Sequence, residues 1–332
     1  MPPAIAPRSS LTRGYAAALA AAAILSTTAI FIRYLTQTYA MPALVLAFWR
    51  DLLVCLTLVP AFLLLRPALL RPGRGQLRHL AAFGLVLAAF NALWTLSVAL
   101  NGAAAATVLV YSSAGFTALL GRWLLGEPLG WGKLAAVALS LAGCAMVSGV
   151  LAGEAWRANL AGIVTGVLSG LGYAAYTLMG RSAARRGLDP WSTVLYAFAF
   201  ATAFLLLVNL FPVGSVPGTA ARPADLFWLH DSAAGWGVLL LLAAGPTVAG
   251  FGLYNVSLTH LPSSVANLVV SLEPAFTAAT AYLLFGERLD AVQLAGGALI
   301  LAAVVFLRVY EGRQERIAAT DHRGALGAAT GG

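Results

Sequence analysis

Residues 116–127 read FTALLGRWLLGE, and residues 276–287, which lie 160 positions later, read FTAATAYLLFGE. The same offset pairs residues 93–142 with residues 253–302 without a gap, and 17 of these 50 pairs are identical. In a chain this rich in Ala and Leu, chance would match only roughly a tenth of the pairs. The chain therefore contains an internal repeat.

The composition around this repeat excludes a soluble protein. Of the 332 residues, 60% are hydrophobic and only 10% are charged, whereas soluble domains have about 45–50% apolar and about 25% charged residues. The apolar runs are near twenty residues long and do not alternate with polar residues, as in residues 235–255. This pattern excludes a transmembrane β-barrel. The fold class is an all-α polytopic membrane protein.

Apolar windows of about 20 residues, delimited by Pro, Gly and Arg, predict ten transmembrane helices. They lie approximately at residues 14–35, 42–65, 78–99, 104–122, 131–151, 159–180, 191–211, 236–258, 262–284 and 289–309. Each copy holds five helices, and because five is odd, consecutive copies enter the membrane from opposite sides. We expect two inverted five-helix repeats over 14–151 and 159–310, flanked by an N-terminal segment, 1–13, and a disordered tail, 311–332.

The basic residues predict the orientation of these spans. Of 20 Lys and Arg residues, 15 fall on one side of the membrane if the N-terminus is cytoplasmic. This bias predicts a multi-pass protein of the bacterial inner membrane, with both termini cytoplasmic and lipids around it. The net charge of +8 lies in short loops and not on one face, so nucleic acid is not an expected partner.

No motif indicates a cofactor, a metal or catalysis. Cys55 and Cys144 lie in apolar segments without a CxxC pattern or a nearby His, and the chain has no GxxxxGK[ST] loop. Neither a Ser/His/Asp set nor a carboxylate pair is suggested. We therefore expect a protein that is not an enzyme, and that draws on a gradient and not on ATP.

Three ionisable residues lie deep within predicted spans, where a charge costs about 2.5–3.5 kcal/mol. Arg50 could clamp a substrate carboxylate, or it could form a buried ion pair that fixes helix packing. Asp51 could meet an amine or carry a proton, or it could be the packing partner. Glu273 could couple transport to protons, or it could be a neutral acid bonded to a backbone carbonyl. Pro274, which follows Glu273, and Pro246 in the eighth span are hinge candidates.

Polar and aromatic residues within the spans are candidates for the wall of a substrate cavity. Two pairs match across the repeat, Trp94 with Tyr254 and Thr95 with Asn255. Aromatic walls with few polar groups are typical of small-molecule pockets, and they are equally typical of helix packing. The candidates are Asn91, Trp94, Tyr111, Ser112, Ser113, Tyr173, Tyr176, Tyr254, Asn255 and Ser271.

Gly162, Gly166 and Gly170 form a GxxxGxxxG ridge on the sixth span, which allows close helix approach. The ridge could be a dimer face, or it could serve packing or sliding within one bundle. A monomer and a homodimer both remain open. The inverted repeat itself predicts alternating access, because two halves that exchange conformations turn a central cavity from one side to the other. A channel-like protein without alternating access is the alternative.

The repeated segment resembles the EamA-type signature of the drug/metabolite transporter superfamily. The resemblance rests on residues 271–276 (SLEPAF) and 284–287 (LFGE) of the second copy, and on Trp49 and Arg50 in the second span. The first copy keeps Phe116 and 125–127 (LGE) but has Ser113 and Ala114 where the second has Glu and Pro. Span count, repeat and cytoplasmic termini are also similar.

This resemblance implies a secondary transporter, active or facilitated, that exports small organic metabolites, with amino acids the commonest substrates of bacterial members. The chain length and the aromatic-rich helices are similar to the YddG kind of amino-acid exporter, which implies aromatic amino acids. Drugs and other metabolites of the superfamily are the alternative substrates. Proton coupling is a further expectation.

Overall fold

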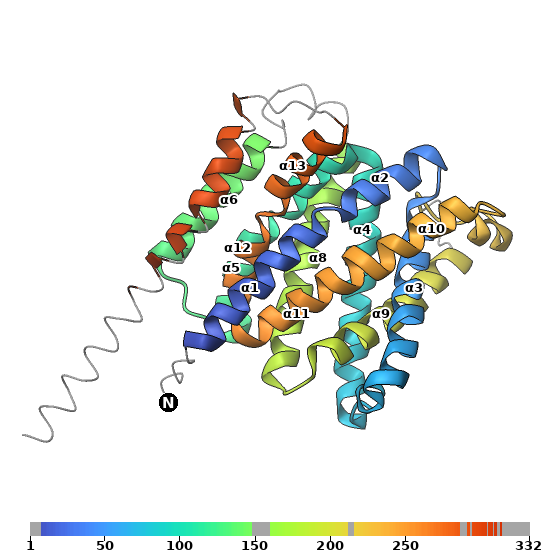
Figure 1. Ribbon diagram of the computed structural model, residues 1–332, viewed down its shortest axis with the longest axis horizontal. Helices are drawn as coiled ribbons and strands as arrows, with labels where there is room; N and C mark the ends of the chain where they lie inside the picture. Colours follow the sequence, from blue (N-terminus) through green and yellow to red (C-terminus); the bar gives the residue numbers. More distant parts are fainter. Residues whose placement is uncertain are drawn as a thin grey trace, which may run out of the picture.

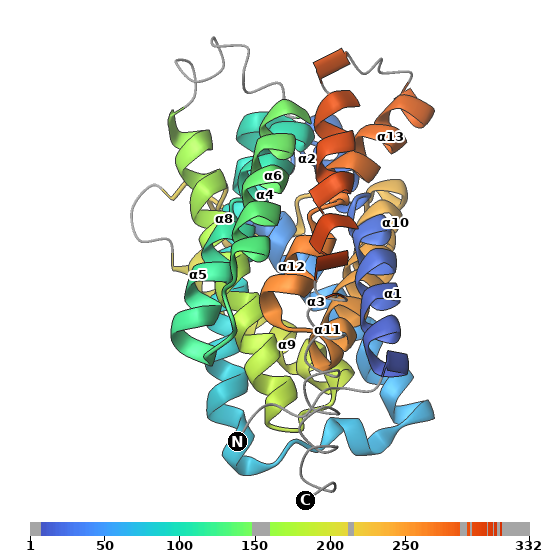
Figure 2. The same cartoon turned by 90° about the vertical axis from the view of Figure 1, so that its left-hand side faces the viewer.

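The computed structural model describes residues 8–147, 160–211 and 216–285, together with 291–292, 294–303, 305–307, 309–310 and 313. Every regular element within these residues is helical. The helices run side by side in an elongated bundle (Figure 1), and the view turned by 90° shows the same arrangement (Figure 2). Residues 1–7 of the predicted N-terminal segment, and nearly all of the predicted tail, lie outside the described residues.

The elements of the first half precede residue 148, and those of the second half follow residue 159. The first half contains α1 (Arg8–Leu25), α2 (Thr28–Thr38), α3 (Ala43–Leu65), η1 (Pro67–Leu70), η2 (Arg74–Gln76), α4 (Leu77–Val110), α5 (Ser113–Leu125) and α6 (Trp131–Val147). The second half contains α8 (Leu160–Arg185), α9 (Pro190–Leu210), η3 (Pro223–Phe227), α10 (Ala233–Leu242), η4 (Ala243–Gly250), α11 (Phe251–His260), α12 (Ser263–Val270) and α13 (Glu273–Phe285). A shorter apolar helix at Leu294–Leu307 follows.

Within the described residues, six helical segments are long and apolar enough to cross a membrane. They are Leu11–Thr38, Ala43–Leu65, Leu77–Ala103, Leu160–Arg185, Pro190–Leu210 and Ala233–His260. Large apolar side chains on the outside of the bundle are exposed, for example Leu64 at 85%, as expected of a protein whose surface faces lipid. The structure confirms the all-α polytopic fold class.

The predicted fourth and ninth spans are each two half-helices and not one continuous helix. The fourth breaks at Tyr111 and Ser112, and the ninth breaks 160 positions later, at Ser271 and Leu272. Both breaks have the same backbone pattern, because Ser112 N–H donates to Leu109 O and Leu272 N–H donates to Val269 O, each at 3.2 Å. The repeat is therefore visible in the local hydrogen bonding.

Side-chain chemistry explains where these helices break. Pro274 has no N–H to donate and would clash with the carbonyl of residue 270, so α13 begins beside it instead of continuing α12. Pro274 thus lies in the first turn of a half-helix and does not kink a continuous one. The first span breaks between α1 and α2, where Ser26 Oγ donates to Ala23 O (2.7 Å) and Thr27 Oγ1 donates to Ile24 O (2.8 Å).

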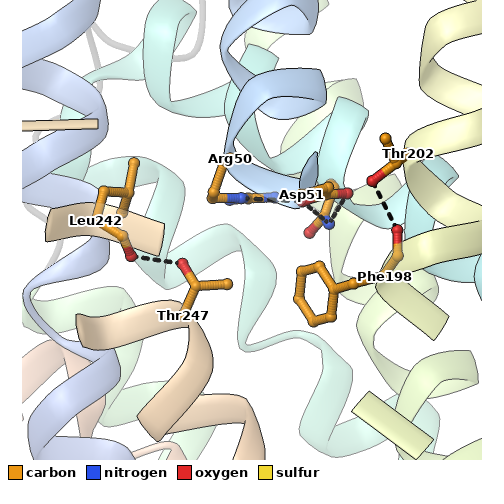
Figure 3. Close-up of polar contacts among 7 residues, drawn as sticks. Arg50, Asp51, Phe198, Thr202, Leu242 and Thr247 are labelled. Atoms are coloured by element: carbon orange, nitrogen blue, oxygen red, sulfur yellow. Dashed lines mark hydrogen bonds and ion pairs between the residues drawn. The ribbon is translucent and has the colours of Figure 1, made fainter. Parts of the chain in front are cut away.

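Pro246, the other hinge candidate, lies inside η4, a π-helical segment in the middle of the eighth span. Because proline lacks an N–H, it leaves the carbonyl of Leu242 without its helical donor. Thr247 Oγ1 donates to this carbonyl at 2.8 Å (Figure 3). The distortion is therefore stabilised by a local hydrogen bond.

The glycine ridge of α8 packs within the bundle, against α4 and the break of the fourth span. A Cβ at Gly166 would lie 2.5 Å from the side chain of Leu109, and one at Gly170 would lie 3.1 Å from Val110 O. Gly162 O accepts a hydrogen bond from Asn101 Nδ2 at 2.8 Å. These contacts support the packing interpretation of the ridge, because all three glycines contact other helices of the same bundle.

Candidate functional site

A cavity of about 30 Å³ lies in the middle of the bundle, where the breaks of the first, fourth and ninth spans meet. Both halves of the chain contribute to its wall. Its polar wall residues are Thr28, Arg50, Tyr111, Tyr173 and Glu273. Its apolar wall residues are Leu25, Phe90, Trp94, Val110 and Phe251. Five predicted site residues are thus brought together: Arg50, Trp94, Tyr111, Tyr173 and Glu273.

The volume of this cavity defines the conformation. About 30 Å³ holds one or two water molecules, whereas pockets for small organic molecules have about 300–1,000 Å³. The structure therefore represents a narrow state of the central cavity.

Arg50 and Asp51 form a buried ion pair on α3 (Figure 3), with 1% and 0% of their surfaces exposed. Arg50 Nε donates to Asp51 Oδ1 at 3.2 Å. Asn91 Nδ2, on α4, donates to Asp51 Oδ1 and Oδ2 at 2.9 and 2.8 Å. Asp51 is fully engaged by these groups, and Asn91 lies behind it and not in the cavity wall.

Glu273 is the first residue of α13 and accepts a hydrogen bond from the hydroxyl of Tyr111 at 2.5 Å. The observed partner is thus a hydroxyl and not the backbone carbonyl that one interpretation of Glu273 required. Tyr111 stands at the break of the fourth span, and Glu273 directly follows the break of the ninth. The bond therefore joins the break of the fourth span to the break of the ninth, and so links the two repeats.

Three polar atoms of the cavity wall are buried and make no hydrogen bond to the described residues. They are Thr28 Oγ1, Arg50 Nη2 and the Tyr173 hydroxyl oxygen. A buried polar atom without a partner costs about 1–3 kcal/mol, so these three atoms are unfavourable in this arrangement of the helices. Together they supply a cationic donor and two hydroxyls.

An aromatic cluster adjoins this polar wall. The rings of Phe90 and Tyr173 are stacked with centroids 5.1 Å apart, and those of Tyr176 and Phe251 meet edge to face at 5.3 Å. Tyr254 is also buried in the cluster, with its centroid 5.6 Å from that of Tyr173. The cluster gives the cavity one aromatic side.

The other predicted wall residues are not part of this cavity wall, and most of them make hydrogen bonds to neighbouring groups. Asn255 Nδ2 donates to the Tyr176 hydroxyl at 2.6 Å, and the Tyr254 hydroxyl pairs with Thr177 Oγ1 at 2.7 Å. Three serines bond elsewhere: Ser112 to Leu109 O at 2.8 Å, Ser113 to Asn267 at 3.3 Å and Ser271 to Ser140 at 2.7 Å. For these residues the structure favours the packing interpretation.

The sequence prediction omitted Thr28, Phe90 and Phe251 from the wall. Thr28 begins α2, and its place depends on the break in the first span. The consecutive Ser26, Thr27 and Thr28 within an apolar run were the available signal for that break. Phe90 is one residue from Asn91, and the sequence contains no signal that would select Phe251.

A second contact between the repeats lies at one end of the bundle. Glu127 is 4% exposed, and its Oε1 accepts from the backbone N–H and hydroxyl of Ser263, both at 2.8 Å. Its Oε2 accepts from the backbone N–H and hydroxyl of Ser264 at 3.3 and 3.1 Å. Glu127 therefore caps α12, a helix of the other repeat. Its repeat counterpart, Glu287, lies outside the described residues.

The family model of the EamA-like transporter family matches this chain twice, over residues 12–149 and 160–309. The chain belongs to the EamA-like transporter family. This family belongs to the drug/metabolite transporter superfamily.

Several proteins are similar to this EamA-like transporter in sequence. A protein named Uncharacterized transporter from Archaeoglobus fulgidus is 29% identical over 43% of this chain and 46% of its own length. Protein PA1977 from Pseudomonas aeruginosa is 32% identical over 71% of this chain and 76% of its own. Protein RarD from Streptomyces exfoliatus is 31% identical over 36% of this chain and 43% of its own. The alignment thus spans about half of the Archaeoglobus protein.

A solved crystal structure is similar to this EamA-like transporter in fold. It aligns with 92% of this chain and 99% of its own, with a TM-score of 0.68 and 18% sequence identity. At this identity the likeness concerns the fold alone.

Proposed function

We propose that this EamA-like transporter is a secondary exporter, active or facilitated, of small organic metabolites, and that amino acids, aromatic ones included, are its substrates. The observation that supports this proposal is the central cavity, whose wall comes from both repeats and contains Arg50 and Glu273. Alternating access follows when the two repeats exchange conformations around this cavity.

The chemistry of the cavity wall suits a zwitterion with an apolar side chain. Arg50 Nη2 has no partner among the described residues, and guanidinium donors bind carboxylates strongly. Glu273 can accept hydrogen bonds from an ammonium group, while Phe90 and Tyr173 offer an aromatic face. The groups of opposite charge lie in one wall, as recognition of an α-amino acid requires.

The Lys and Arg distribution supports placement in the bacterial inner membrane with both termini in the cytoplasm. In this orientation the turn that holds Glu127 and the start of α12 lie at the cytoplasmic end. Export then requires that end to open for loading, and the opposite end to open for release.

Counterflow in liposomes tests the proposed function. Vesicles preloaded with unlabelled phenylalanine should transiently accumulate labelled phenylalanine through the purified protein, because a carrier exchanges one molecule for another. Accumulation should saturate with concentration. A flux that rises linearly with concentration would favour a channel, and no flux of any amino acid in a panel would contradict the substrate class.

We predict that Glu273→Gln uncouples transport from protons. Glu273 accepts a hydrogen bond from Tyr111 and lines the same cavity as Arg50 and Tyr173, and Gln keeps its size but cannot release a proton. Net uptake driven by an imposed pH gradient should fall at least tenfold, while phenylalanine counterflow should persist. Asp225→Asn, in η3 and away from the cavity, is the control and should leave both assays unchanged. A variant whose response to the pH gradient equals that of the wild type would remove the coupling role of Glu273.

A further inference from the structure

We propose that Asn91 is a positioning residue for substrate recognition: it donates to both oxygens of Asp51 and so keeps one arm of Arg50, a residue of the cavity wall, from pairing with Asp51. This inference rests on the proposed function, in which Arg50 binds the carboxylate of the substrate. It assigns a role to a side chain that does not line the cavity.

The first observation is the way in which Arg50 is held. Arginine and carboxylate groups frequently pair through two parallel hydrogen bonds. Here the Arg50 guanidinium donates only one hydrogen bond to Asp51, from Nε at 3.2 Å. Its Nη2 is buried without a partner among the described residues. The ion pair therefore leaves donor capacity unused beside the cavity.

The second observation is the position of Asn91. Its Nδ2 lies 2.9 and 2.8 Å from the two oxygens of Asp51, and its side chain is fully buried. A donor that bridges both oxygens occupies the position in front of the carboxylate where a guanidinium would form two parallel hydrogen bonds. Asn91 thus competes with Arg50 for Asp51.

The physical consequence concerns the direction of the guanidinium. Without Asn91, the most favourable partner for Nη2 is the second oxygen of Asp51, since both groups are buried and oppositely charged. Arg50 would then pair with Asp51 through two bonds and withdraw Nη2 from the cavity wall. Carboxylate recognition would weaken even though every residue of the wall is still present.

Asn91→Leu tests this role, because leucine has a similar volume and no donor. Counterflow is measured with phenylalanine and with phenylalaninamide, which lacks the carboxylate. We expect the half-saturation concentration for phenylalanine to rise about tenfold, while that for the amide changes less than twofold. The maximal exchange rate should remain within twofold of that of the wild type, because Arg50 itself and the moving helices are intact.

Asn209→Leu is the matched control. Asn209 is also buried, but it bonds to backbone groups, Leu44 O and Leu205 O, at 3.2 and 2.9 Å. A merely structural effect lowers the melting temperature and the rates for both compounds together, and that is the result expected for Asn209→Leu. If Asn91→Leu does not yield folded protein, Asn91→Ser, which keeps one donor, takes its place. Its half-saturation concentration for phenylalanine should rise about threefold, while that for the amide should stay nearly unchanged.

The outcomes separate this inference from the proposed function. Wild-type protein that exchanges neither compound contradicts the proposed function, and the role of Asn91 with it. Wild-type exchange of phenylalanine with an unchanged preference in both Asn91 variants contradicts only the role of Asn91. Equal losses for the acid and the amide assign Asn91 to packing.

Discussion

The Arg50→Met variant is expected to lose carrier-mediated exchange of phenylalanine and to unfold at a lower temperature than the wild type. The substitution removes the guanidinium from the cavity wall, and with it the donor proposed for the substrate carboxylate. It also leaves Asp51 buried without its counter-charge. Breaking a buried ion pair in this way costs about 3–5 kcal/mol, so the melting temperature and the exchange rate are both measured.

A double variant separates these two effects. In Arg50→Met/Asp51→Asn no buried charge remains unpaired, and Asn at position 51 can still bond to Asn91. Replacing both partners of a buried pair is often neutral for stability, so the melting temperature should return toward that of the wild type. Exchange should remain absent. If the double variant exchanges phenylalanine like the wild type, the pair serves packing only.

The second large effect is expected for Glu127→Ala, which should open the end of the bundle where Glu127 caps α12. The substitution deprives the backbone N–H groups of Ser263 and Ser264 of their acceptor. Each buried donor left unsatisfied costs about 1–3 kcal/mol, and the contact between the repeats is lost. The equilibrium should therefore shift toward the state that is open at this end.

Thiol labelling measures this opening. Ala266 lies on α12 behind the cap and is fully buried, so Ala266→Cys in a background without Cys55 and Cys144 reports access. Labelling by a small, membrane-impermeant reagent should accelerate at least tenfold with Glu127→Ala. Ala201→Cys, which is equally buried in α9, should label at an unchanged rate. If Ala266→Cys is labelled at the same rate with Glu127 and with Glu127→Ala, then Glu127 only caps the helix and does not control opening.

The fold was largely predictable because hydropathy reports burial in lipid directly. The runs that become α3, α8 and α9 differ from the predicted spans by a few residues. The breaks of the fourth and ninth spans were not predictable in this way, since a hydropathy window measures composition and not backbone hydrogen bonding. Pro274 signalled one break, and its counterpart at Tyr111 and Ser112 contains no proline.

The candidate site was predictable where burial is costly. Arg50 and Glu273 stood out because an ionisable group inside a membrane needs a partner or a function, and both reach the cavity wall. Asn255 and Ser271 were also predicted to line the cavity but are not part of this wall, because the helices are apolar all round. The sequence then contains no amphipathic pattern that would set the rotation of each helix. The contact of Asn91 with Asp51 joins two separate helices, and the sequence could not predict it for the same reason.

The small volume of the central cavity also bears on the search for inhibitors. Compounds selected to fit this conformation could be little larger than water, so screening should target a wider state. A compound that binds only the wider state would draw the population toward it by mass action. Such a compound would raise the melting temperature, by an amount that grows with the logarithm of its concentration above Kd, which offers a ligand screen that needs no transport assay.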